Sequence, residues 1–541
     1  MRLRPKHAWL LAFTAVFAVL AGFVFWGTWS TEIAPVMPDC ATSYSVHWFL
    51  EWLRGWLENG KFAPAEAINW IGSPYLWTEF QYAFAAYMAA LGLVYFLRGR
   101  GLPRVAAYGA GLLLAFSGYW FTLFSAGHLG WFQWMTYGVF SFGLVDRALE
   151  KGKPRHWLLL GACLAWGSMR QPDMWLLFSV FTGVYFFFRL VVVIRGMPQD
   201  RGALRDALVR WAKGSGLALA ALLAIGGASF RSAFVNDLAG RDKQIEEGQT
   251  VAANATKDDA EKRWIFVTNW SMPPEATKEF WHSSIEGDTS CPFTLAIGQK
   301  RGNGIRPYAG RLGRPIDAPS GNYRQHSLYV GIATCLFAFA CVFWTMFKRF
   351  DAPSTGTILF FVISAVVFWL FSMGRYCEPV YRLVYALPFG DYLRAPVKWH
   401  HLTEFCLCVL AGYGIWGWMK VEDKRASLRV KTIGAVVVIL LGVVDLVSND
   451  RLYCAPHRAD ADMQFVDARI LKDPRGMEQI RQMRAHVLGT YRGGALIEVP
   501  KAFPKFAQAP ELPSPNPTTL VLGVLSLLGT VAVGAYGVKK S

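Results

Sequence analysis

Apolar segments that are almost free of charge recur along most of this chain, and they decide what it can fold into. Each is close to the length of about 20 residues at which a helix crosses roughly 30 Å of hydrocarbon. Of the 541 residues, 53% are hydrophobic, which exceeds what the core of an ordinary soluble domain requires. An open sheet would leave backbone groups unpaired in lipid, and the alternating pattern of a membrane barrel is absent. The sequence therefore predicts an all-α polytopic membrane protein.

The lengths of these segments predict about twelve transmembrane helices. We expect them at approximately 8–28, 77–97, 104–124, 129–146, 156–170, 173–194, 213–230, 327–347, 355–373, 399–419, 429–447 and 517–537. The first is interpreted as a retained span rather than a signal peptide, because it is too long for a usual signal segment and lacks a small-x-small cleavage site. Between Arg155 and Arg195 the alternative is one long hairpin kinked at "MRQPD".

The net charge of +17 follows the topology of the chain. Lys and Arg gather in alternate short connectors, for example Arg98 to Arg104 and Lys420 to Lys431, so the positive-inside rule makes both termini cytoplasmic. This placement argues against a nucleic-acid partner, which the charge would suggest in a soluble protein. The bilayer is the expected partner, and the large loops are expected to be extracytoplasmic.

These boundaries divide the chain into five parts. We expect an N-terminal transmembrane module over 1–230 with a first outer loop at 30–76, an extracytoplasmic loop or subdomain over 231–325, a second transmembrane module over 326–447, an extracytoplasmic segment over 448–516 and a C-terminal transmembrane helix over 517–541. Connectors as long as 231–325 are usually functional or disordered.

Common catalytic motifs are missing, so chemistry has to be sought in the outer connectors. No Walker loop, HExxH, zinc-type cysteine pairing or GxSxG elbow occurs. The first outer loop contains Asp39 and Tyr44 ahead of apolar and aromatic residues at three- and four-residue spacing, which predicts an amphipathic helix on the membrane surface. Taken alone, an acid in the position of Asp39 is more often a helix cap or turn residue than a catalytic one.

Two short turns and one longer connector supply the other candidates. The turn "SAGHLG" contains His128, and "SMRQPD" contains Arg170, Gln171 and Asp173. An arginine held by a nearby acid can bind phosphate, although snorkelling with a local ion pair explains it too. The connector before the tenth expected span carries several cations although it lies on the outer side by parity: Arg375, Arg382, Arg394 and Lys398, with Asp391, His400 and His401. Such a departure from the positive-inside rule indicates an anionic ligand, either a lipid-carrier phosphate or ordinary head groups.

The chain resembles YfhO-type bacterial membrane proteins in three stretches. In the first, Asp39 and the amphipathic helix are followed by "NGKFAP" and "NWIGSPYLW". The second begins "HLGWFQWMTYG" and contains the His turn, and the third is "LPFGDYLRAPVKWHHLTEFCLCVLAGYGIWGW". The similarity covers roughly the first 200 residues and again about Tyr323 to Trp418. It implies a GT-C-like fold, the class of integral membrane glycosyltransferases, in the bacterial cytoplasmic membrane.

The resemblance also implies a reaction and roles for residues. Such enzymes transfer a sugar from a polyprenyl phosphate to an acceptor outside the cell membrane, here an envelope glycan, lipid or protein. Asp39 would be the general base, and Arg394 and Lys398, with Arg170 or Arg375, would stabilise the departing phosphate. Tyr44, His128, Gln171, Asp173 and His400 complete the expected substrate site. The sequence has "PDCA" in place of the adjacent acids of some GT-C enzymes, so we assign no metal ligand and no cofactor from it, and metal dependence stays open.

Two other functions fit the sequence. A transporter or lipid-linked-saccharide flippase would also have about twelve spans, but we expect few ionisable groups within them, where coupling sites are usually found. The other alternative to the enzyme is an inactive scaffold that keeps the fold. The enzyme predicts that Asp39 and the outer cations converge, whereas a transporter predicts a polar path at the depth of the bilayer centre.

Overall fold

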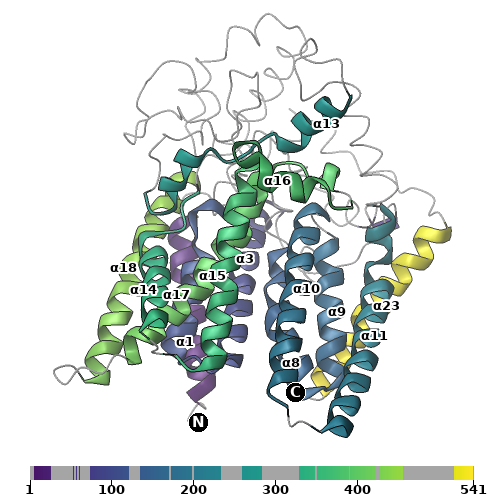
Figure 1. Ribbon diagram of the computed structural model, residues 1–541, viewed down its shortest axis with the longest axis horizontal. Coiled ribbons are helices and arrows are strands. Elements are labelled where there is room, and N and C mark those ends of the chain that lie inside the picture. The colour runs from purple at the N-terminus through teal and green to yellow at the C-terminus, as the bar shows by residue number, and fades with distance from the viewer. Residues whose placement is uncertain are drawn as a thin grey trace, which may run out of the picture.

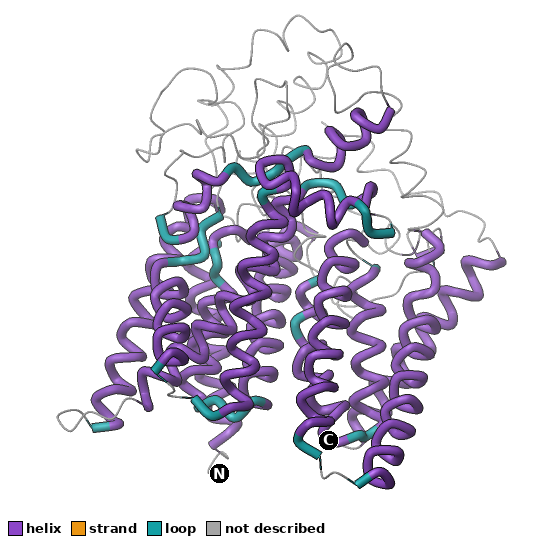
Figure 2. Tube along the Cα trace, in the orientation of Figure 1, coloured by secondary structure: helices purple, strands orange, loops and turns teal. Residues whose placement is uncertain are grey.

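The structure is a computed structural model, and it describes residues 5–25, 53, 56–57, 60, 74–120, 134–169, 172–197, 200–232, 259–282, 328–347, 350–388, 390–420, 427–454 and 517–539. Within these residues there are 15 α-helices and four short 3-10 helices but no strand (Figure 2). The prediction of an all-α fold is therefore confirmed.

Among the described residues, eight helices are long and apolar enough to cross a membrane, so the chain is a polytopic membrane protein. They are α1 (Pro5–Val24), α3 (Pro74–Gly99), α10 (Pro172–Arg195), α11 (Arg201–Ser232), α15 (Ala352–Ser372), α17 (His400–Lys420), α18 (Leu428–Cys454) and α23 (Pro517–Lys539). Each overlaps one of the segments expected from the sequence over most of its length, because hydropathy and length alone specify a transmembrane helix.

The other four expected spans coincide with shorter helices in the same bundle. They are α4 (Arg104–Ala115), α8 (Phe140–Lys151), preceded by the single turn α7 (Met135–Gly138), α9 (Pro154–Ser168) and α14 (Ile332–Met346). The short α9 and the long α10 are separate helices that contact each other. The break lies where α10 begins at Pro172, a residue that lacks an N–H and is tolerated in a first helical turn. The kinked single hairpin is thus not the arrangement adopted.

The bundle has two distinct ends (Figure 1). The start of α1 and the end of α23 lie at one end, which we call the termini end. Helices α13 (Asp259–Thr268) and α16 (Glu378–Tyr385) lie across the other, which we call the distal end. The 3-10 turns η3 (Pro274–Phe280), η4 (Gly374–Cys377), η5 (Gly390–Tyr392) and η6 (Pro396–Trp399) lie on the connections between these helices and the bundle.

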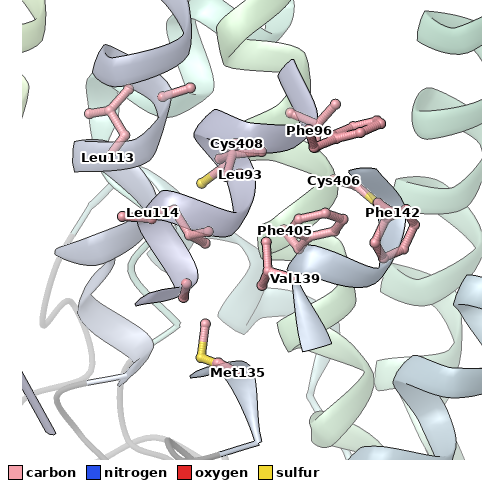
Figure 3. Close-up of a cluster of buried hydrophobic side chains, with 14 of the residues drawn as sticks. Leu93, Phe96, Leu113, Leu114, Met135, Val139, Phe142, Phe405, Cys406 and Cys408 are labelled. Carbon is pink, nitrogen blue, oxygen red and sulfur yellow. The ribbon is translucent and has the colours of Figure 1, made fainter. Parts of the chain in front are cut away.

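Helix α17 is the central helix of one half of the bundle. It packs on α4, α14, α15 and α18 and is buried along most of its length. At its contact with α3 and α8, Phe405 lies against Phe142 with ring centroids 4.9 Å apart, and Phe96 packs on the same ring (Figure 3). Helix α3 joins this half to α8, which continues through α9 and α10 to α11 and α23. The N-terminal and second transmembrane modules therefore share one hydrophobic core.

A buried ion network holds five helices together near the termini end. Arg189 of α10 donates to Asp146 of α8 over 2.5 Å and to Glu150 over 2.7 Å. Tyr185 donates to the same Asp146 carboxylate over 2.9 Å. Arg100, just after α3, lies 3.8 Å from Asp146, donates to Thr357 of α15, and interacts with Tyr413 of α17. Mutual pairing makes burial of these charges tolerable in an apolar bundle.

Candidate functional site

Two connectors that are far apart in sequence lie side by side at the distal end. The Ala395 N–H donates to the Val267 carbonyl over 3.2 Å, and the Val397 N–H donates to the Trp270 carbonyl over 3.2 Å. Trp270 and Ala395 have positive φ angles of 58° and 66°, and they are the non-glycine residues with this backbone conformation in the described chain. Such conformations persist where surrounding contacts impose them, and they often occur at functional sites.

A buried ion pair joins this connector to the start of α10. The Lys398 ammonium contacts the Asp173 carboxylate, and the two side chains are 9% and 3% exposed. The second carboxylate oxygen accepts the Met174 N–H over 2.9 Å, which fixes the acid at the N-terminus of α10. The sequence placed these residues in separate groups of candidates, and the fold brings them together.

Arg394 and Arg375 lie on the same connectors but contact different partners. The Arg394 guanidinium lies 4.0 Å from the centre of the Trp270 ring and 4.8 Å from that of Phe266. The Arg375 guanidinium donates to the Thr268 carbonyl over 2.8 Å and 3.2 Å. Arg375 therefore fixes the backbone beside Trp270, whereas Arg394 presents its charge above an aromatic ring.

The first turn of α17 carries two buried histidines. The His400 Nε2 lies 3.2 Å from the Leu328 carbonyl, and since a carbonyl only accepts, this nitrogen carries the proton. The His400 ring packs on Phe280, with centroids 4.5 Å apart. His401 packs between aromatic rings, 4.3 Å from Tyr119 and 4.6 Å from Trp120. Both imidazoles are held by contacts on more than one face.

Glu404 lies one turn further along α17. Together with Lys398, His400 and His401 it forms what we call the polar cluster. Glu404 is fully buried, accepts a hydrogen bond from Ser117, and places a carboxylate oxygen 3.5 Å from His401 Nδ1. Asp450, at the end of the apolar part of α18, is also fully buried. Neither of its carboxyl oxygens has a hydrogen-bond partner among the described residues. The expectation of few ionisable groups within the spans thus misses a cluster that faces the bundle interior.

Helices α13 and α16 cover the connector that holds Arg394 and Lys398. Arg263 of α13 pairs with Asp391 over 3.3 Å, and Arg382 of α16 lies 4.1 Å above the ring of Trp264. Burial raises the pKa of Tyr381, so its hydroxyl stays protonated and donates to the Leu393 carbonyl over 3.2 Å. The covering helices therefore fix the connector from outside.

An apolar groove of about 370 Å³ opens beside the histidines. Its walls come from η3, α14, α15 and α17, and all its lining residues are apolar or weakly polar: Thr277, Phe280, Trp281, Cys335, Ala338, Phe339, Val342, Val362, Ala365, Val366, Trp369, Thr403, Leu407 and Leu410. Phe339 and Val366 are 66% and 48% exposed, so the groove opens on the lipid-facing surface. Phe280 lines the groove and also packs on His400, which places the groove next to the polar cluster.

The candidates are thus only partly placed. Asp39, Tyr44, His128, Arg170 and Gln171 lie outside the described residues. Of the others, Asp173, Lys398, Arg394, Arg375 and His400 all lie at the distal end, and Asp173 and Lys398 form an ion pair with each other. The residues that sequence reasoning missed are Glu404, Asp450 and Ser117. The spacing of His401 and Glu404, three residues apart in a predicted helix, was a readable signal for the first of these.

The described side chains do not form a metal site. Within the placed parts of the chain, no group of three or more His, Cys, Asp and Glu residues has a geometry suited to a metal ion. Comparisons with protein-family models, curated proteins and solved structures give no match. What sequence and structure define together is the class, a polytopic all-helical membrane protein, and they identify no family within it.

Proposed function

We propose that this protein is a GT-C-type membrane glycosyltransferase that transfers a sugar from a polyprenyl-phosphate donor to an extracytoplasmic acceptor. The observation that carries the proposal is the position of a lipid-facing apolar groove directly beside the buried histidines of α17, which follow the Lys398–Asp173 ion pair. A lipid-linked sugar has the same two parts, an isoprenoid tail and a charged phosphate at the level of the head groups.

The topology supports this proposal. With α4, α8, α9 and α14 counted as spans, the chain crosses the membrane about twelve times. The termini end holds the basic connectors and would be cytoplasmic by the positive-inside rule, in a bacterial inner membrane. The distal end, with the candidate site and the long connectors, would then face outward. The YfhO-like arrangement of the first outer loop would add Asp39 to this end.

Lys398 is the residue best placed to stabilise the leaving phosphate. Its ammonium is a compact positive charge, and pairing with Asp173 fixes its position. Arg394 would add a second charge from above Trp270. The attacking acceptor hydroxyl would lose its proton to Asp39 as the bond from the anomeric carbon to the phosphate oxygen breaks. A positive charge in a site shielded from water acts on the developing negative charge more strongly than it does in solvent.

The alternative is a transporter or a lipid-linked-saccharide flippase. Glu404 and Asp450 favour it, because buried acids in spans often mark coupling sites. The ion network of Asp146, Arg189 and Arg100 weighs against it, since it ties five helices together where alternating access would require them to separate.

The test is donor consumption by the purified protein. A panel of polyprenyl-phosphate sugars is supplied with extracted envelope acceptors, and the donors are followed by mass spectrometry. We expect consumption by the native protein and by an Arg382→Gln control, and about 10²-fold or greater loss in Asp39→Asn and Lys398→Met. Full activity of either variant would remove that residue from the mechanism. Movement of an intact donor across liposomes, without consumption, would instead establish the flippase.

A further inference from the structure

A second cavity lies at the termini end, far from the candidate site. It has a volume of about 490 Å³ and lies between the α8–α9 connector and the first half of α11. One stripe of α11 lines it, at the three- and four-residue spacing of a helix face: Asp206, Val209, Arg210, Lys213, Gly214 and Leu217. Gly152, Pro154 and Trp157 form the facing wall.

The residues of this stripe change from charged to apolar along α11. Arg210 and Lys213 lie toward the start of the helix, Leu217 lies one turn further on, and Ala220 and Ala224 follow on the same face. Helix α11 is 32 residues long, which exceeds the roughly 20 residues that cross the hydrocarbon, so its first turns reach the head-group level. The cavity therefore lies where a lipid has its phosphate, and the apolar surface beyond lies where a lipid has its chains.

The polar groups of the cavity are available to a ligand. Arg210, Lys213 and Asp206 form no ion pair with one another or with other described residues. The Trp157 side chain is 1% exposed, lies against Gly214, and has no acceptor for its indole N–H in the described chain. Two cations and a buried donor on facing walls match the oxygens of a phosphate, and Asp206 leaves a net positive charge.

The local backbone holds these groups in position. Gly152 has a φ of +60°, and a Cβ at this residue would lie 2.7 Å from Arg210 Cδ, so only glycine lets the arginine pass over the connector. The Trp211 indole, on the buried side of α11, donates to the Leu149 carbonyl over 3.0 Å and fixes the helix against the end of α8. The cavity is therefore built by the fold.

We propose that this cavity binds the phosphate head group of an anionic glycerophospholipid, with its acyl chains along Leu217 and the alanines that follow it on the same face of α11. Arg210 and Lys213 contact the phosphate from α11, and the Trp157 indole donates from α9. A free phosphate ion shares the head-group chemistry but not the chains. The site is separate from the candidate site at the distal end and does not depend on the reaction proposed there.

The test is a binding titration on purified, delipidated full-length protein in neutral detergent, read by native mass spectrometry. The probes are dioctanoyl phosphatidylglycerol, dioctanoyl phosphatidylcholine and inorganic phosphate. We expect phosphatidylglycerol to bind more tightly than the other two. We expect Arg210→Gln with Lys213→Gln to weaken it about 25-fold, roughly 5-fold for each cation.

The matched control is Arg201→Gln with Arg205→Gln, which removes the same charge from exposed positions on the same helix. It should change the affinity by less than about twofold. Trp157→Phe, which keeps the ring and removes the donor, should also weaken binding, and unfolding curves for each variant establish that the fold is intact. Equal loss in both double variants, or an unchanged affinity in Arg210→Gln with Lys213→Gln, would overturn the proposal. Binding of phosphate as tight as that of the lipid would make this a free-anion site and overturn the lipid assignment.

Discussion

Asp173 and Lys398 form a buried ion pair across 225 residues of sequence, and this pair joins the start of α10 to the connector that enters α17. Removing one partner leaves a charge buried without its counter-ion. We expect Asp173→Asn or Lys398→Met to reduce the free energy of unfolding by about 3–5 kcal/mol, and the double variant to lose less than either single variant.

Unfolding in a detergent titration measures these values, with Glu378→Gln and Arg382→Met as the control pair. That pair is half-exposed, 2.7 Å apart and one turn apart on α16, and we expect its loss to cost less than about 1 kcal/mol. If the effects of Asp173→Asn and Lys398→Met simply add in the double variant, the two residues are not coupled.

The ion network near the termini end gives a second prediction. Arg189→Met removes both contacts of the arginine. The buried Asp146 is then left with the Tyr185 hydroxyl and the more distant Arg100, 3.8 Å away, as partners. We expect the free energy of unfolding to fall by about 3–5 kcal/mol. Arg147→Met serves as the control, since that guanidinium lies 3.6 Å above the Tyr95 ring near the surface, and its loss should cost about 1 kcal/mol or less. Equal losses of unfolding free energy in the two variants would show that Arg189 contributes no more to stability than a surface cation.

Glycines at helix crossings give a third prediction. A Cβ on Gly161 of α9 would overlap the Ala218 carbonyl of α11, whereas a Cβ on Gly183 of α10 meets nothing within 4 Å. Gly161→Ala should therefore destabilise the bundle by about 1–3 kcal/mol through overpacking. Gly183→Ala should stabilise it by up to about 1 kcal/mol, because alanine favours a helix more than glycine does. Thermal unfolding of both variants measures the two changes in stability. A change of the same sign in both variants would contradict the close crossing of α9 and α11.

The apolar groove gives a prediction that rests on the proposed function. Val366→Trp fills the lipid-facing mouth of the groove, so it should raise the KM for a long-chain polyprenyl donor while sparing a short-chain analogue. Leu441→Trp on α18 is the control, because this side chain is 64% exposed and lies outside the groove. Kinetics with both donors test the prediction. An equal loss with the short and the long chain would show that the groove does not hold the tail.

Much of this fold could be predicted from the sequence, because hydropathy and helix length are local properties. The start of α10 at Pro172 and the end of α17 at Lys420 lie within a few residues of the expected boundaries. The contacts between helices are not local, and no pattern in "SMRQPD" or "RAPVKWHH" indicates that Asp173 meets Lys398. The short α4, most of whose residues are buried, also shows that a helix surrounded by others can be shorter than a lipid-exposed span.

The candidate site was predicted less completely than the fold. The cations before α17 could be recognised in the sequence because they violate the positive-inside rule. The structure places two of them, Lys398 and Arg394, at the distal end. Glu404 did not stand out, because one acid in an otherwise apolar helix changes the mean hydropathy little. Its partner Ser117 lies just after the end of α4, and this contact is visible only in three dimensions. Asp39 stays a prediction that rests on the first outer loop.

The central claim is that one donor occupies the apolar groove and the polar cluster together. Photo-crosslinking with a diazirine-bearing polyprenyl phosphate tests it most directly, because it needs neither the correct sugar nor an acceptor. We predict that the label attaches to peptides of α14 and α15 around Phe339 and Val366. It should be displaced by unlabelled polyprenyl phosphate and reduced in Lys398→Met but not in Arg382→Gln. Labelling spread over the lipid-facing helices, with α18 marked as strongly as α15 and no response to Lys398→Met, would contradict the account.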